Sequence, residues 1–149
     1  MLLAMNVQTI LAALLALGAP KAVAPSFAAA IACHAKTPDE AAFLAAWAEH
    51  ESHFVARIVR NECKPWECDR GRARGAWQLH RGAAGSDWDV LPGNLDAQAR
   101  SAARMARWAL RECKAPLGAF RRLGGLGCDR SLKGEDARMA SFKKARGML

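Results

Sequence analysis

Glu51 is the residue whose type and position most strongly suggest chemistry. It lies in the run Trp47-Ala48-Glu49-His50-Glu51-Ser52-His53-Phe54, near the carboxyl end of an expected alanine-rich helix. Carboxyl groups that face the negative end of a helix dipole and an apolar side chain hold their protons more tightly than in water. Such a group can act as a general acid near neutral pH. On position alone, however, an ordinary surface glutamate at a helix end is the simpler interpretation.

Two further segments change that interpretation. Glu51-Ser52-x-Phe54 is followed by Gly75-Ala76-Trp77-Gln78-Leu79, and later by Leu117-Gly118-Ala119-Phe120 before a glycine-rich turn. Over residues 38–128 this order resembles the soluble lytic transglycosylase and goose-type lysozyme family, which shows an E-S-x-F helix end, a G-[LAP]-[MW]-Q-[IL] segment and a later aromatic residue. The chain departs from the family at Phe120-Arg121, where the family has a Tyr-Asn pair, and it contains no tyrosine. Any contact of a tyrosine hydroxyl with the catalytic carboxyl is therefore absent or replaced.

The resemblance implies an enzyme that cleaves peptidoglycan between N-acetylmuramic acid and N-acetylglucosamine. Glu51 would be the single catalytic residue, and the substrate-binding residues would be Ser52, Gly75, Trp77, Gln78 and Phe120. In the implied scheme Glu51 protonates the glycosidic oxygen, and the acetamido group of the substrate stabilises the sugar cation. Glu51 then acts as a base, either on the muramyl C6 hydroxyl to give a 1,6-anhydro product or on water to give hydrolysis. No cofactor and no metal are expected.

Residues in the expected loops provide further candidates. Trp66 and Trp88 are flanked by charged residues and suit stacking on sugar rings, whereas core packing is the simpler role for Trp77. The amide of Gln78 suits bonding to the backbone as well as binding an N-acetyl group. A second carboxylate in the cleft would favour hydrolysis, and the loops contain Asp69, Asp87 and Asp89. Surface or supporting roles are the simpler interpretation for His50, His53 and His80.

The odd number of cysteines allows at most two disulfides and leaves one thiol over. The five are Cys33, Cys63, Cys68, Cys113 and Cys128. One interpretation is a pair of disulfides formed in an oxidising compartment, with Cys33 as a buried free thiol. The alternative is a zinc site made of Cys63, Cys68 and one of the three histidines named above. The sequence has neither a CxxC pair nor an HxxxH motif to support it.

Helices must position these residues, and capping signals indicate where the longest ones begin. Thr37-Pro38-Asp39-Glu40 combines a capping residue, a proline suited to the first helical position and a glutamate that completes a capping box. We predict a helix from there to about His53. Asn94 caps a second long helix with an apolar stripe on one side and arginines on the other. Further helices are expected at 24–34, at 116–123 and from Gly134 onward.

The segments between these helices are expected to be irregular. Residues 61–75 and 82–93 show no helical periodicity, and they contain prolines, glycines and two cysteines. No segment alternates apolar and polar residues for long enough to indicate an extended strand. The sequence therefore predicts a single all-α domain over residues 1–149, lysozyme-like by the resemblance, with at most a small hairpin or irregular loop at 61–80.

The first 24 residues allow two interpretations. An apolar run from Ile10 to Ala19 leads to Ala22-Val23-Ala24, which is typical of a cleaved signal peptide. No lysine or arginine precedes Lys21, and the apolar residues recur at helical spacing, which favours an extra helix that is retained. Beyond the first 20 residues no apolar stretch is long enough for an integral membrane span.

Charge is distributed unevenly along the chain. The 149 residues are 52% apolar and 24% charged, as expected for one globular domain, and the net charge is +8. Residues 61–149 hold 18 basic and 10 acidic groups and therefore the whole excess. Its densest part is Arg100, Arg104, Arg107 and Arg111 on the second long helix. This pattern predicts a polyanionic partner, and on charge alone nucleic acid, anionic lipid and bacterial cell wall are all open. The family resemblance implies the glycan strands of peptidoglycan.

Two other functions stay open at this point. A small basic nucleic-acid-binding protein could use the same arginines and Lys143-Lys144-Ala145-Arg146, although neither helix-turn-helix spacing nor interleaved aromatic residues support it. A wall-binding or virion subunit could retain the fold without activity. The enzyme itself would act in the bacterial cell wall or periplasm. It would be a phage virion or lysis component, with virion or envelope protein partners, or a secreted protein.

Overall fold

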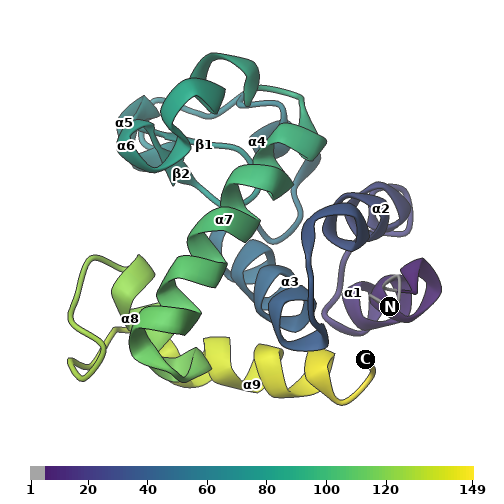
Figure 1. Ribbon diagram of the computed structural model, residues 1–149. Helices are drawn as coiled ribbons and strands as arrows, with labels where there is room; N and C mark the ends of the chain where they lie inside the picture. Colours follow the sequence, from purple (N-terminus) through teal and green to yellow (C-terminus); the bar gives the residue numbers. More distant parts are fainter. Residues whose placement is uncertain (1–5) are drawn as a thin grey trace.

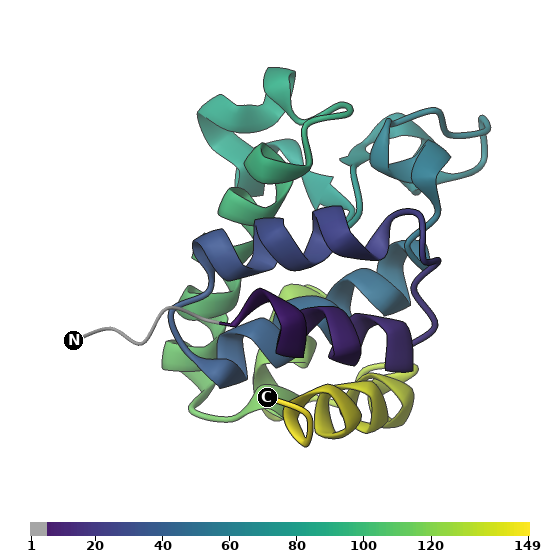
Figure 2. The same ribbon diagram turned by 90° about the vertical axis from the view of Figure 1, so that its right-hand side faces the viewer.

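The computed structural model describes residues 6–149, which fold into helices and one small hairpin (Figures 1 and 2). The long helices are α3 (Pro38–Ser52) and α7 (Leu95–Cys113), accompanied by α1 (Val7–Ala16), α2 (Ala24–His34), α8 (Pro116–Leu123) and α9 (Glu135–Arg146). The short elements are α4 (Ala56–Val59), α5 (Cys68–Gly71), β1 (Ala73–Arg74), β2 (Leu79–His80), α6 (Arg81–Ala84) and the 3-10 turn η1 (Gly85–Val90). The predicted all-α class with a small hairpin is confirmed.

Helix α3 forms the centre of the molecule. It packs against α1, α2, α7 and α9, and its residues 40–48 are all buried. More than half of the buried apolar residues in the described chain are alanines, so the helices can approach one another closely. Large side chains such as Phe43 and Leu44 fill the space that remains. We call α1, α2, α3, α7, α8 and α9 the helical body.

Both ends of α3 follow from local chemistry. At the start, the Thr37 hydroxyl accepts a hydrogen bond from the Glu40 amide at 3.1 Å, and Pro38 occupies the first turn. At the end, His53 and Phe54 adopt left-handed backbone conformations, with φ of 47° and 57°. The Ser52 hydroxyl donates to the Ala48 carbonyl at 2.9 Å and accepts from the Phe54 amide at 3.3 Å. Glu51 therefore sits in the last turn of a firmly terminated helix.

The N-terminal segment belongs to the core. Helix α1 buries Ile10, Ala13 and Leu14 and packs against α2, α3 and α9. The expected helix over residues 24–34 is present as α2. The packing of α1 fits the extra helix expected within residues 1–24, of which residues 1–5 lie outside the described part of the chain.

Residues 55–93 form the second region, which we call the loop lobe; it lies above the helical body in Figure 1. Strands β1 and β2 pair in antiparallel register, with Ala73 opposite His80 and Arg74 opposite Leu79. The expected irregular loop at 82–93 is wrong for most of its length, because α6 and η1 cover residues 81–90. These short turns depend on tertiary bonds to α7: the Asp87 carboxylate accepts from Arg100 at 3.1 Å and from Ser101 at 2.8 Å.

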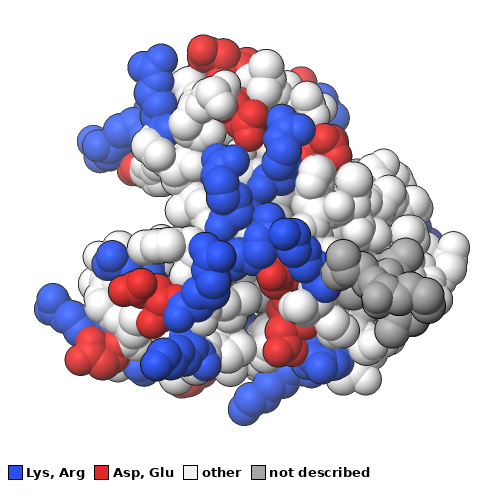
Figure 3. Space-filling model, in the orientation of Figure 1, with Lys and Arg blue, Asp and Glu red and all other residues white. Residues whose placement is uncertain are grey.

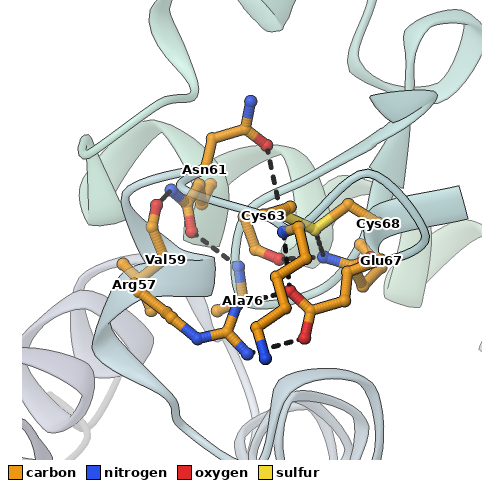
Figure 4. Close-up of a disulfide and its surroundings, with 11 residues drawn as sticks. Arg57, Val59, Asn61, Cys63, Glu67, Cys68 and Ala76 are labelled. Carbon is orange, nitrogen blue, oxygen red and sulfur yellow. Dashed lines mark hydrogen bonds and ion pairs between the residues drawn. A yellow bond between two sulfur atoms is a disulfide. The ribbon is translucent and has the colours of Figure 1, made fainter. Parts of the chain in front are cut away.

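Two disulfides form, Cys63–Cys68 in the loop lobe and Cys113–Cys128 between the end of α7 and the segment after α8. Figure 4 shows the first of them, with Arg57 and Glu67 beside it. Cys33 is the free cysteine, but it is exposed, so the expectation of a buried thiol is wrong. It lies in the last turn of α2, on a side that the neighbouring helices leave uncovered.

Within residues 6–149, no helix combines the length and the apolar character needed to cross a membrane.

Candidate functional site

A cleft of about 500 Å³ opens between the loop lobe and the helical body. In the space-filling view of Figure 3 it is the notch at the left edge. Three parts of the chain line it: α3 with Trp47 and Glu51, the loop lobe with Asp69, Ala73, Trp77, Gln78 and His80, and the end of α8 with Leu123 and the following Gly124 and Gly125. The cleft thus brings Glu51 together with the Gly75–Leu79 segment. In sequence the two are separated by residues 52–74, which include the first half of the loop lobe.

Glu51 is a half-buried carboxylate with one guanidinium beside it. Its side chain is 28% exposed, and Arg138 Nη2 lies 3.4 Å from Oε1. Arg138 comes from α9, is itself largely buried, and donates from Nη1 to the Lys133 carbonyl at 2.9 Å. Among residues 6–149, Arg138 is the residue that donates a side-chain hydrogen bond to the Glu51 carboxylate, and it does so at Oε1. Oε2 therefore stays available to a ligand in the cleft.

Arg138 is a residue that sequence reasoning missed. It belongs to no motif and stands 87 positions after Glu51, within a helix whose basic residues look like a solvated face. Only the packing of α9 against α3 brings the two side chains together. No local pattern in the sequence carries that information.

His50 lies beside the same pair, in surroundings that disfavour its protonated form. Burial lowers the pKa of His50, and the positive charge of Arg138 lowers it further, against the opposing effect of Glu51. A neutral imidazole brings no charge to the site and can donate one hydrogen bond and accept another. His53, by contrast, is exposed and lies 3.9 Å from Glu49, as expected for a surface residue.

The opposite wall of the cleft carries Asp69 and His80. Their side chains lie 3.7 Å apart, and Asp69 also accepts from Arg72 Nη2 at 3.0 Å. Asp69 stands in α5, a single turn in which residues 68–71 all have positive φ. This left-handed conformation is unfavourable for non-glycine residues, and the Cys63–Cys68 disulfide holds one end of the turn. The loop lobe therefore presents a second carboxylate to the cleft.

Trp77 and Gln78 line the cleft, but both also serve the fold. Trp77 is fully buried, and its indole Nε1 donates to the Leu44 carbonyl at 2.9 Å, so it is a core residue rather than a platform for sugars. The Gln78 amide donates to the Gly75 carbonyl at 2.9 Å and contacts Cys68 Sγ at 3.4 Å. Its carbonyl oxygen is the part of the amide that these bonds leave for a ligand.

Three predicted substrate-binding residues do not line the cleft. Ser52 is buried, and its hydroxyl is used in the end of α3. Gly75 has φ of 75°, and a Cβ there would lie 2.4 Å from the side chain of Gln98, so only glycine fits. Phe120 is buried and stacks on Phe43 with ring centroids 4.1 Å apart. In this structure all three shape the elements around the cleft instead of touching its contents.

The other loop candidates also lie outside the lining. Trp66 is 72% exposed, with Lys64 above its ring. Trp88 is buried with Arg74 stacked on it at 4.1 Å, so the expectation that it stacks on sugars is wrong. Asp87 is bound by α7, and its hydrogen bonds from Arg100 and Ser101 lower its pKa. Asp89 is exposed near Arg74, and of the three loop aspartates only Asp69 lines the cleft.

The arginine row of α7 is mostly engaged within the protein. Figure 3 shows basic residues across the face that α7 occupies in Figure 1. Arg100 binds Asp87 and Asp96, Arg104 bonds to the carbonyls of residues 83 and 84, and Arg107 binds Glu40 and the His34 carbonyl. These bonds join α7 to the loop lobe, α2 and α3. The row is therefore less available to a polyanion than its charge suggests.

The zinc alternative at Cys63 and Cys68 does not hold. The two sulfurs are bonded to each other, and a disulfide offers no thiolate to a metal ion.

Comparison with protein-family models, curated proteins and solved structures found no match for the chain. The functional argument therefore rests on the cleft and on the residues that line it.

Proposed function

We propose that the protein is a peptidoglycan-cleaving muramidase that acts as a lytic transglycosylase, with Glu51 as its catalytic acid and base. One observation carries the proposal: the cleft joins Glu51 to the Trp77-Gln78 segment, two of the three parts of the chain on which the family resemblance rests. A half-buried carboxylate in a groove between two regions is the arrangement that glycosidic cleavage needs.

The chemistry requires only one protein carboxyl group. Protonated Glu51 gives its proton to the glycosidic oxygen, the C1–O bond breaks, and the N-acetylglucosamine side leaves as an alcohol. The carbonyl oxygen of the muramyl acetamido group stabilises the electron-poor C1. Glu51, now a carboxylate, accepts the proton of the C6 hydroxyl while the C6 oxygen bonds to C1. This step closes the 1,6-anhydro ring.

Arg138 positions the carboxyl group for both steps. Its hydrogen bond to Oε1 fixes the rotation of the carboxyl group and leaves Oε2 for the proton transfer. Phe120 occupies the place where the family has a tyrosine, and it cannot supply a hydroxyl. Arg138 is the polar residue that contacts Glu51 in this chain, and it takes over the positioning.

Asp69 bears on the choice of product. A carboxylate across the cleft from Glu51 could orient a water molecule against C1, which would produce hydrolysis beside the anhydro sugar. The hydrogen bond from Arg72 and the contact with His80 hold Asp69 in place. Mass spectrometry of the muropeptide products distinguishes the outcomes, and we expect mainly 1,6-anhydro ends, with less hydrolytic product from Asp69→Asn.

The test of the proposal is Glu51→Gln measured on purified peptidoglycan. We expect turbidity clearing to fall by at least about 100-fold, because the amide cannot transfer the proton. Glu49→Gln is the matched control: Glu49 is on the same helix and bonds to Ser141 of α9, but it does not line the cleft. Undiminished clearing by Glu51→Gln, with unchanged helical circular dichroism, would overturn the assignment.

The substrate also sets the site of action and the rival functions. We propose that the enzyme acts in the bacterial cell wall or periplasm, and the two disulfides suit such an oxidising environment. A catalytically dead subunit would bind the wall and leave it intact in the same assay. A nucleic-acid-binding protein would shift duplex DNA in a salt-dependent way, although the internal pairing of Arg100, Arg104 and Arg107 weakens that alternative.

A further inference from the structure

Outside the cleft, three side chains of types that can ligate metals gather where α2 ends and α7 begins. Cys33 and His34 are the last two residues of α2, and Asp96 is in the first turn of α7. One ligand atom of each, the thiol sulfur, an imidazole nitrogen and a carboxylate oxygen, lies within 4.8 Å of the other two. His34 Nε2 and Asp96 Oδ1 are only 2.7 Å apart.

The three ligand types together favour one metal. Thiolate and imidazole are preferred by Zn²⁺ over Mg²⁺ and Ca²⁺, which take oxygen ligands, and a carboxylate completes a mixed set that zinc commonly accepts. Three protein ligands leave the fourth tetrahedral position to water, because Cys33 and Asp96 are exposed to solvent. The exposed side chains of Cys33 and Asp96 can adjust around the half-buried His34.

The surroundings hold the cluster in place. The backbone carbonyl of His34 accepts from Arg107 Nη1 at 3.0 Å, which fixes the end of α2 to α7. Arg100 lies 3.5 Å from Asp96 Oδ2 and leaves Oδ1 toward His34. The carboxyl end of α2 carries the negative end of its dipole, which also favours a cation. The ligands are thus presented by the ends of two packed helices rather than by a mobile loop.

We infer that Cys33, His34 and Asp96 form a Zn²⁺ site that clamps the end of α2 to the start of α7. Binding releases the proton of the Cys33 thiol to solvent and breaks the hydrogen bond between His34 Nε2 and Asp96 Oδ1. The imidazole then carries its proton on Nδ1 and offers the Nε2 lone pair to the ion. None of the three residues lines the Glu51 cleft, so the ion stabilises the fold and takes no part in sugar cleavage. The inference is independent of the proposed function.

Zinc titration of the metal-free protein against a chromophoric chelator tests the site. We expect one Zn²⁺ per chain and, at a free concentration about 100-fold above Kd, a rise in Tm of about 5–10 °C. Co²⁺ in place of Zn²⁺ should give a thiolate charge-transfer band, and Zn²⁺ should protect Cys33 from alkylation by iodoacetamide. Wall-clearing activity should survive removal of the metal.

Two variants and one matched control complete the experiment. Cys33→Ser and Asp96→Asn change exposed side chains and should fold, yet each should weaken Zn²⁺ binding by at least about 10-fold. His80→Ala is the control, because His80 forms a His–Asp pair with Asp69 that has no thiol near it, and it should bind zinc normally. No stoichiometric binding by the wild type, or binding unchanged in Cys33→Ser, would overturn the site.

Discussion

The helical body and the loop lobe form the two sides of one cleft but are held together by different forces. The body is packed with alanines and a few large side chains such as Phe43 and Leu44, which are fully buried. The loop lobe buries fewer apolar side chains, among them Trp77, Leu79 and Leu91, and relies also on single polar bonds such as those of Asp87 with Arg100 and Arg57 with Glu67. The stabilisation from packing is spread over many weak contacts, whereas each of these polar bonds contributes individually and can be lost by changing one residue.

This difference suits the proposed chemistry. Glu51 comes from the body, where α3 is buried on all sides and its end is fixed. Asp69 and Gln78 come from the lobe, where individual hydrogen bonds from Arg72 and to the Gly75 carbonyl hold them. In the proposed reaction the group that transfers the proton is therefore held by packing, whereas the groups opposite it are held by single polar bonds.

The largest effect should come from removing a large side chain from the body. Phe43→Ala takes away a ring that stacks on Phe120, and the surrounding alanines cannot fill the space. We expect the free energy of unfolding in urea to fall by about 3–5 kcal/mol. Val90→Ala, at an exposed position in the lobe, should change it by less than about 0.5 kcal/mol. Equal losses in the two variants would remove the contrast between the regions.

A smaller effect should follow from breaking the joint between the regions. The side chain of Gln98, fully buried on α7, accepts from the Ala76 amide at 2.8 Å and donates to the carbonyls of Val59 and Leu91. Figure 4 shows Val59 and Ala76, two of these partners in the lobe. Gln98→Ala leaves three buried groups unpaired and should lower the free energy of unfolding by about 2–4 kcal/mol.

Gln98→Ala should also affect the two regions unequally. Hydrogen exchange should become faster mainly at residues 55–93, and wall clearing should fall even where the protein stays folded, because the lobe carries one wall of the cleft. Gln8→Ala, on the exposed side of α1, is the control and should leave both measurements unchanged. Uniformly faster exchange across the body and lobe would show that the two regions unfold as one unit.

The body was the more predictable region because its signals are local. The capping box at Thr37 and the cap at Asn94 place α3 and α7 close to their observed starts. The motif segments containing Glu51 and Gln78 do reach the same cleft. The cleft itself depends on how α3 meets the loop lobe, which no spacing in the sequence specifies.

The features that the sequence could not show are tertiary. Arg138 reaches Glu51 only through the packing of α9, and Asp69 enters the cleft only because a left-handed turn redirects the chain. Gly75 and Phe120 were expected to bind substrate, but both support the fold. Gly75 lets the Gln98 side chain pack directly against the backbone, and Phe120 stacks on Phe43. Motif residues around a site can serve its shape as readily as its ligand, and burial is what separates the two roles.

The smallest effect should appear as a pH dependence of two ion pairs, Arg57–Glu67 in the lobe and Arg121–Glu135 in the body. In the lobe, hydrogen bonds from Arg57 and from the Lys64 amide lower the pKa of Glu67 from 4.5 to about 2. Arg121 and the Leu132 amide lower the pKa of Glu135 in the body to about 2 as well. A carboxylate whose pKa is lower in the folded state stabilises the fold above the unfolded value, and this contribution is lost as the pH falls from about 4.5 to about 2.

Glu67→Gln should therefore lower Tm at pH 7, and its difference from the wild type should shrink toward zero as the pH falls to about 2. Glu135→Gln is the matched variant in the body and should show the same sign. The regions differ in where protection is lost: Glu67→Gln should speed amide exchange at residues 57–68, next to the cleft, whereas Glu135→Gln should affect the start of α9. A Tm difference that stays constant from pH 7 to pH 2 would contradict a stabilising Arg57–Glu67 ion pair, since only an ionised Glu67 binds Arg57 strongly.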